Sequence, residues 1–119
     1  NEVENVKLCK DVLVQPAKQL PLYSASVLPK VTQFSRAVSG ACQLAFFSDG
    51  YKLTYKSNVF SLECVLGNCT EYYYTLDTYA EYLPMIFRLI DEAQAFLTVG
   101  RNAVMIEVPG SLRLLHSIV

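Results

Sequence analysis

The residues of this sequence that could do chemistry are few and far apart. His116 is the only histidine, and carboxylates such as Asp49, Glu63 and Glu107 have no partner at the spacing that acid–base catalysis needs. A Gly-x-Ser-x-Gly nucleophile motif and a Gly-rich phosphate loop are both absent from the sequence. The apolar neighbours of His116 predict a partly buried strand residue. We therefore expect a protein that is not an enzyme and that uses no cofactor.

The cysteines do not form a metal-binding pattern. Only two of the four are close together, and no second close pair exists to complete a zinc site. Three of them stand in or beside apolar stretches where a free thiol is readily buried, so we expect reduced thiols and no metal. At least one disulfide is the alternative, since four cysteines permit two disulfides in three pairings, and Asn68-Cys69-Thr70 matches an N-glycosylation motif, as in a secreted or viral surface domain. The cysteines are Cys9, Cys42, Cys64 and Cys69.

Length and composition predict one folded domain over residues 1–119. Hydrophobic residues make up 52% and charged residues 18% of the chain, which excludes a disordered protein. No apolar run approaches the ~18 residues of a membrane helix, so we expect no membrane contact. We also expect a cytoplasmic location, with a secreted or viral context left open. The net charge of −1 excludes a uniformly basic nucleic-acid module but allows a local basic face.

The first half of the chain predicts a strand, a helix and three strands. A stretch rich in Val and Leu at 6–15 indicates the first strand, and Pro16 and Pro21 bracket a connection that cannot continue a central strand. Apolar residues recur at spacings of four, three and four within 26–38, which predicts a helix with Pro29 in its first turn. These apolar residues are Val27, Val31, Phe34 and Val38. The three predicted strands are 41–48, 51–56 and 59–66.

The second half predicts the same order of elements. Residues 72–75 have high strand propensity, and Thr78-x-x-Glu81 matches a capping box, so a helix is expected to begin there. Pro84 should kink this helix, or else its regular part begins later. The expected core stripe is Leu83, Ile86, Phe87 and Ile90, and the expected exposed face is Glu81, Arg88 and Glu92. The three predicted strands are 94–99, 103–108 and 111–119.

The two halves also share residues at a constant offset of 55 positions. The identical pairs are Ala25 and Ala80, Leu28 and Leu83, and Pro29 and Pro84. The repeat divides the chain into half-repeats of about 1–67 and 68–119. Each half is too small to bury a core alone, so we expect an α+β fold. In this duplicated βαβββ arrangement, two helices pack on one face of a larger antiparallel sheet.

The doubled βαβββ order resembles one domain of the DNA sliding clamps, the ring-shaped processivity factors. The stretch 31–37, Val-Thr-Gln-Phe-Ser-Arg-Ala, is similar to the first helix of the middle domain in bacterial clamps, and 96–108 is similar to the region after the second helix. In that family the two helices line a central hole and touch phosphates loosely. The resemblance implies weak, sequence-independent DNA binding and polymerase or clamp-binding peptides as partners. It also implies a homo-oligomer or a part of a longer chain. The implied DNA-binding residues are Lys30, Gln33, Arg36 and Arg88.

A protein-interaction or assembly domain without DNA contact is the alternative. The apolar last strand, 111–119, is a candidate for an exposed edge, and exposed edges pair with other chains. The tyrosines at 72–74 also suit an interface. The second helix is acidic on its outer side, where Glu81, Asp91 and Glu92 outnumber Arg88 and should repel phosphate.

Overall fold

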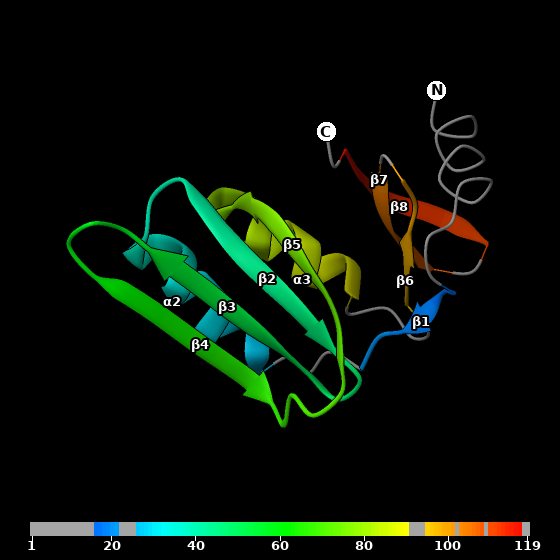
Figure 1. Cartoon of the computed structure of the whole chain (residues 1–119), viewed down its shortest axis with the longest axis horizontal. Coiled ribbons are helices and arrows are strands. Elements are labelled where there is room, and N and C mark those ends of the chain that lie inside the picture. The colour runs from blue at the N-terminus through cyan, green and yellow to red at the C-terminus, as the bar shows by residue number, and fades with distance from the viewer. Residues whose placement is uncertain (1–15, 22–25, 91–94, 102, 109, 118–119) are drawn as a thin grey trace.

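The computed structural model describes residues 16–21, 26–90, 95–101, 103–108 and 110–117, the last seven of these as backbone only. The first predicted strand, at 6–15, lies outside the described residues. Within them the protein is α+β, with two α-helices and two antiparallel sheets (Figure 1). The elements in chain order are β1 (Lys18–Gln19), α2 (Val27–Ala37), β2 (Ala41–Phe47), β3 (Gly50–Lys56), β4 (Ser61–Gly67), β5 (Tyr72–Tyr79), the short 3-10 helix η1 (Ala80–Tyr82), α3 (Leu83–Ile90), β6 (Phe96–Val99), β7 (Ala103–Val108) and β8 (Ser111–Ser117).

The strands form two sheets rather than the one larger sheet that we predicted. One sheet has the order β4-β3-β2-β5 and the other β1-β6-β7-β8. In each sheet a strand that precedes a helix pairs with the first strand that follows the other helix: β5 pairs with β2, and β1 pairs with β6. The two-residue strand β1 lies between Pro16 and Pro21, whose missing N–H groups restrict them to sheet edges and strand ends, and it is the outer strand of this sheet among the described residues.

The first sheet is built from tight hairpins whose turns follow the predicted signals. Strands β2 and β3 are joined by Ser48 and Asp49, and the next residue, Gly50, pairs with Phe47 on one side and Gly67 on the other. A Cβ atom at Gly50 would lie 2.4 Å from the carbonyl oxygen of Leu66, so only glycine fits this position. Asp49 fixes the neighbouring connection, because its carboxylate accepts a hydrogen bond from the Thr70 amide at 2.8 Å.

The helix α2 confirms the predicted helix within one residue at each end. Val31 and Phe34 are fully buried on the predicted face, and Val38 is buried just past the end. Pro29 is the third helical residue and lies within the first turn, where an N–H group would have no partner inside the helix, so its missing N–H removes no helical hydrogen bond. Gly40 has a φ of +87°, which turns the chain from the helix into β2.

The predicted capping box at Thr78 is wrong, because β5 continues to Tyr79. Thr78 pairs with Cys42 in the sheet, and this pairing holds its backbone extended. Its side chain is buried, and its hydroxyl has no hydrogen-bond partner in the described part of the chain. The regular helix α3 starts at Leu83, so Pro84 stands in its first turn and causes no kink.

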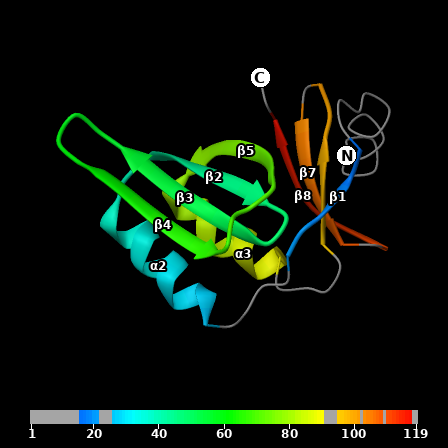
Figure 2. The ribbon, with the colours of Figure 1, turned by 60° about the horizontal axis from the view of Figure 1, so that its bottom comes forward.

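One hydrophobic cluster joins both helices to both sheets. The helices lie side by side on the same face of the β4-β3-β2-β5 sheet, and the second sheet stands beside them (Figure 2). The four predicted core residues of α3 are all buried, and the Phe87 ring meets the Tyr51 ring edge-on at 5.1 Å. Burial raises the pKa of the Tyr51 phenol, whose hydroxyl donates to the carbonyl oxygen of Pro21 at 2.8 Å. The second sheet adds Leu97, Val99, Val104 and Ile106.

Candidate functional site

The four residues that the sequence proposed for DNA contact are all exposed on the helices. Lys30, Gln33 and Arg36 belong to α2, and Arg88 belongs to α3. They are exposed because the opposite side of each helix faces the sheet. That buried side consists of Val31 and Phe34 in α2 and of four buried residues in α3. The structure therefore places these side chains on the helical layer, as expected, while their contact with DNA stays a prediction.

The side chains of α2 divide between two surfaces. Arg36 lines a shallow depression of about 490 Å³ along the outer side of the helix, together with Pro29. Lys30 faces the edge strand β4 instead and lines a groove of about 420 Å³ between α2 and that strand. Gln33 lies between the two and lines both. The structure therefore separates Lys30 from Arg36, although both lie on one helix.

The groove between α2 and β4 combines apolar and charged groups. Phe34 from the helix and Leu62 and Cys64 from the strand form its apolar part, and Lys30 and Glu63 lie at its rim. Burial raises the pKa of the Cys64 thiol, and the nearby Lys30 ammonium partly opposes this shift. Further along β4, Val65 is 50% exposed, and the turn before the strand exposes Val59 and Phe60. This edge therefore presents apolar side chains to solvent.

The outer side of α3 is less basic than that of α2. Among the residues described in η1 and α3, the negative charge of Glu81 cancels the positive charge of Arg88. In contrast, α2 carries the positive charges of Lys30 and Arg36 and no acidic residue. The described helical layer thus has two excess positive charges, from three cations and one carboxylate. No salt bridge joins any of these three cations to a carboxylate within the described ranges. The two other acids of the predicted exposed face, Asp91 and Glu92, lie outside the described residues.

An exposed apolar patch at the start of α3 was not predicted from the sequence. Tyr79, Tyr82 and Met85 are 51%, 45% and 43% exposed, and the two tyrosine rings meet edge-on at 6.0 Å. The patch was missed because the expected capping box placed the residues around Tyr79 inside a regular helix. A signal was present, since Tyr82 and Met85 are spaced by three and neither belongs to the core stripe.

The other candidate residues for chemistry are dispersed. No group of three or more His, Cys, Asp or Glu side chains that could hold a metal ion occurs among the described residues. Hydrogen bonding from the Thr70 amide lowers the pKa of Asp49, whose carboxylate has a structural role in the turn. His116 lies in β8 opposite Val104, which confirms a strand position; its side chain lies outside the described part.

The described cysteines are free thiols. Cys42 is buried, and burial raises its pKa to about 11. Cys69 is half-buried and donates to the carbonyl oxygen of Tyr51 at 3.3 Å. Asn68 is exposed in the turn after β4. Disulfides among Cys42, Cys64 and Cys69, as in the secreted alternative, are therefore not formed, and Cys9 lies outside the described residues.

Comparisons of the chain with protein-family models, with curated proteins and with solved structures gave no match. None of the helices in the described part of the chain is long and apolar enough to cross a membrane.

Proposed function

We propose that this chain is a non-enzymatic module of the DNA sliding-clamp kind, which encircles DNA and tethers a polymerase as part of a ring. The observation that carries the proposal is the exchange of strands between the two halves. Within the described residues, the two-residue β1 precedes α2 and pairs with β6 of the second half, while β5 precedes α3 and pairs with β2 of the first half. This exchange supports a duplicated βαβββ unit in which each half completes the sheet of the other.

The position of the helices supports the proposal. The chain folds α2 and α3 against one face of the first sheet, so their outer sides form a common surface. The start of η1 is held to the connection between α2 and β2 by a hydrogen bond from the Ala80 amide to the Gly40 carbonyl oxygen, at 2.9 Å. Gln33, Arg36 and Arg88 lie on the outer sides of the two helices, where a duplex inside a ring would pass.

The charges on this surface suit loose contact with phosphates. Lys30, Arg36 and Arg88 are exposed and free of salt bridges within the described residues, so each is available to a phosphate. Attraction between cations and phosphates is independent of sequence and weakens as salt displaces it. The two cations on the shared outer side, Arg36 and Arg88, predict a slope of about −1.8 for log affinity against log salt, at about −0.9 for each phosphate neutralised. A contact this weak in one module becomes useful when several modules surround the same duplex.

The ring itself has to be formed by further modules. The strands β4 and β8 are outer strands of the two sheets, and outer strands have unpaired backbone groups that can bond to another chain. A head-to-tail contact of this kind closes into a ring when the rotation between neighbours is suitable. The further modules are either copies of this chain or other parts of a longer one.

The test is the salt dependence of duplex binding with matched charge reversals. The assembled chain should bind a duplex of random sequence at low salt, and Arg36→Glu with Arg88→Glu should reduce the affinity at least tenfold. The control is Lys52→Glu with Lys56→Glu, which makes the same change of charge on β3, away from the helices. Equal losses in both double variants would show only non-specific attraction. No binding at low salt by any assembled form would overturn the proposal.

A second candidate is an assembly domain that associates through its sheet edges and does not touch DNA. The exposed Val65 on β4, next to the exposed Val59 and Phe60, favours this function. Light scattering of the wild type and of Val65→Lys separates the candidates. An assembly domain forms oligomers that Val65→Lys disrupts and binds no DNA, whereas a strictly monomeric chain over a wide concentration range contradicts the assembly domain and a ring made of copies of this chain.

A further inference from the structure

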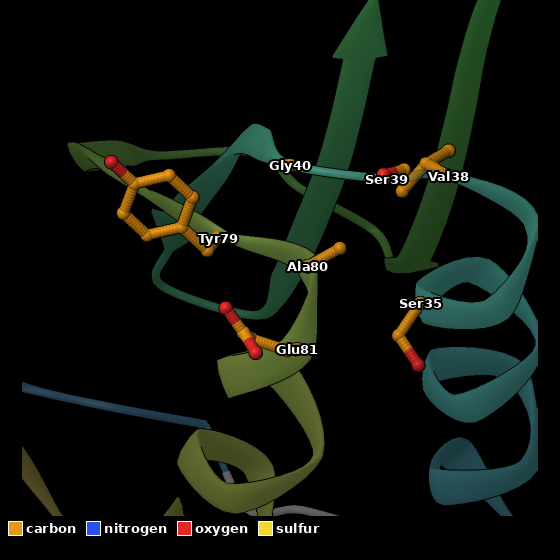
Figure 3. A pocket seen from close by; sticks show the side chains of 7 residues that line it. All are labelled: Ser35, Val38, Ser39, Gly40, Tyr79, Ala80 and Glu81. Carbon is orange, nitrogen blue, oxygen red and sulfur yellow. The ribbon is translucent and has the colours of Figure 1, made fainter.

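A small pocket lies where the end of α2 meets the start of η1. Its volume is about 260 Å³, below the 300–1,000 Å³ that is typical of drug-sized ligands, so it suits a single side chain. In Figure 3 the end of α2 forms one wall and the chain from Tyr79 to Glu81 forms the other. The residues that line the pocket are Ser35, Val38, Ser39, Gly40, Tyr79, Ala80 and Glu81.

The one charged group of this pocket is a carboxylate. Glu81 contributes it in an exposed position, and no salt bridge holds it within the described ranges. The Ser35 hydroxyl already donates to the carbonyl oxygen of Thr32 at 2.8 Å, so towards the pocket it can only accept. The hydroxyls of Ser39 and Tyr79 can donate or accept. The Glu81 carboxylate therefore decides the charge of the ligand, and it favours a cation.

The helix end adds negative potential to the same place. The last carbonyl groups of a helix carry a partial charge of about −0.5. The chain leaves α2 in an extended conformation at Val38, and no hydrogen bond from a backbone amide beyond the helix caps the last carbonyl groups within the described residues. Arg36 stands in the last turn of α2, yet it does not line the pocket. The helix end and the Glu81 carboxylate thus act on the pocket without a neutralising cation in its wall.

An aromatic ring completes the pocket. Tyr79 lines the pocket together with Glu81, and in Figure 3 both side chains extend from the wall opposite α2. The edge-on contact with Tyr82, at 6.0 Å, keeps that ring in place while half of its surface stays exposed. The faces of aromatic rings attract cations, and this attraction adds to that of a carboxylate nearby.

We propose that this pocket binds the cationic end of a lysine or arginine side chain of a partner protein. The inference rests on three independent features, namely the cavity, the unneutralised negative groups and the exposed tyrosine ring. All three favour a cation that carries its own donors, and the volume limits the occupant to one side chain. The inference does not rest on the proposed DNA contact, because none of Lys30, Arg36 and Arg88 lines this pocket.

The experiment is a titration of the full chain, labelled with ¹⁵N, with n-butylammonium chloride as the probe for lysine. The neutral n-butanol has the same alkyl chain and serves as the matched compound. We expect the amide signals of Ser39, Gly40 and Glu81 to shift in a saturable manner with n-butylammonium. The same concentrations of n-butanol should give shifts at least fivefold smaller. n-Propylguanidinium tests the arginine side chain in the same way, and the stronger of the two cations identifies the preferred partner residue.

Variants locate the response in the pocket. Glu81→Gln should weaken the binding of the cation about two- to fivefold, because it removes the negative charge of an exposed ion pair and keeps the shape. The control Glu63→Gln removes an exposed carboxylate from β4 and should leave the affinity unchanged. Equal binding of n-butanol, equal affinity of Glu81→Gln and wild type, or shifts spread over the whole surface would each overturn the proposal. Unchanged amide spectra away from position 81 verify that the variant is folded.

Discussion

The side chain of Thr78 provides a sharp test of how the second helix begins. The residue is 4% exposed and belongs to β5, and its hydroxyl has no partner in the described part of the chain. A buried polar group without a hydrogen bond costs roughly 1–3 kcal/mol. Thr78→Val replaces this hydroxyl with a methyl group of similar size, and valine is equally suited to a strand. We therefore expect Thr78→Val to raise the free energy of unfolding by about 1–2 kcal/mol.

The capping box that the sequence suggests predicts the opposite sign. If the Thr78 hydroxyl capped a helix, its removal would lower the free energy of unfolding by about 0.5–2 kcal/mol. Urea denaturation measures the difference, with the midpoint shifting at a constant slope in both cases. The control is Thr54→Val on the outer face of β3, which should change the stability little. A Thr78→Val variant that is less stable than the wild type would refute the strand assignment at this position.

Three further predictions concern the core, the first hairpin and a buried thiol. Ile86→Ala should lower the free energy of unfolding by about 2–5 kcal/mol and Met85→Ala, its exposed neighbour, by less than about 1 kcal/mol, as measured by urea denaturation. Hydrogen bonding from the Thr70 amide lowers the pKa of Asp49 below its ordinary 3.8. The Asp49 carboxylate therefore stabilises the fold above pH 3.8, and this contribution is lost as the pH falls through the folded pKa. In Asp49→Asn, the free energy of unfolding measured against pH should lack this acid-dependent part. Burial raises the pKa of Cys42 to about 11. At pH 8 we therefore expect alkylation of Cys42 to be about 100-fold slower than alkylation of a solvent-exposed thiol, as measured by mass spectrometry. Equal alkylation rates in the folded chain would contradict the burial of Cys42.

Local patterns in the sequence were sufficient to predict most of the helices and strands. The spacing of Val27, Val31, Phe34 and Val38 predicted α2, since a single face of a helix has to be buried. The turn at Asp49 predicted the hairpin of β2 and β3 for a similarly local reason. The prediction failed at Thr78, where pairing with β2 outweighs the local preference for a helix cap.

The arrangement of strands into two sheets was beyond the sequence patterns. A strand pattern shows which face is buried, but it does not show which neighbour a strand chooses. The pairing of β1 with β6 and of β5 with β2 joins segments that are far apart in the chain. For this reason the individual strands were predicted, but their division between two sheets was not.

For the candidate surfaces too, features set within one helix were predicted, and features formed by distant segments of the chain were not. The exposure of Lys30, Gln33, Arg36 and Arg88 was predicted correctly, because each stands opposite a buried stripe on its own helix. The pocket beside Glu81 was not predicted, because its two walls come from different halves of the chain. Likewise, the separation of Lys30 from Arg36 depends on the position of β4, which no pattern within α2 reveals.

The central claim is that this fold belongs to a ring around DNA, and retention on circular DNA tests it most directly. The assembled chain, as a ring of copies or within its full-length parent, is loaded on a nicked circular plasmid and washed at a salt concentration that removes electrostatic binding. A ring stays on the closed circle and slides off once the plasmid is cut at one site. Loss of the protein at high salt from circular and cut DNA alike would contradict the claim.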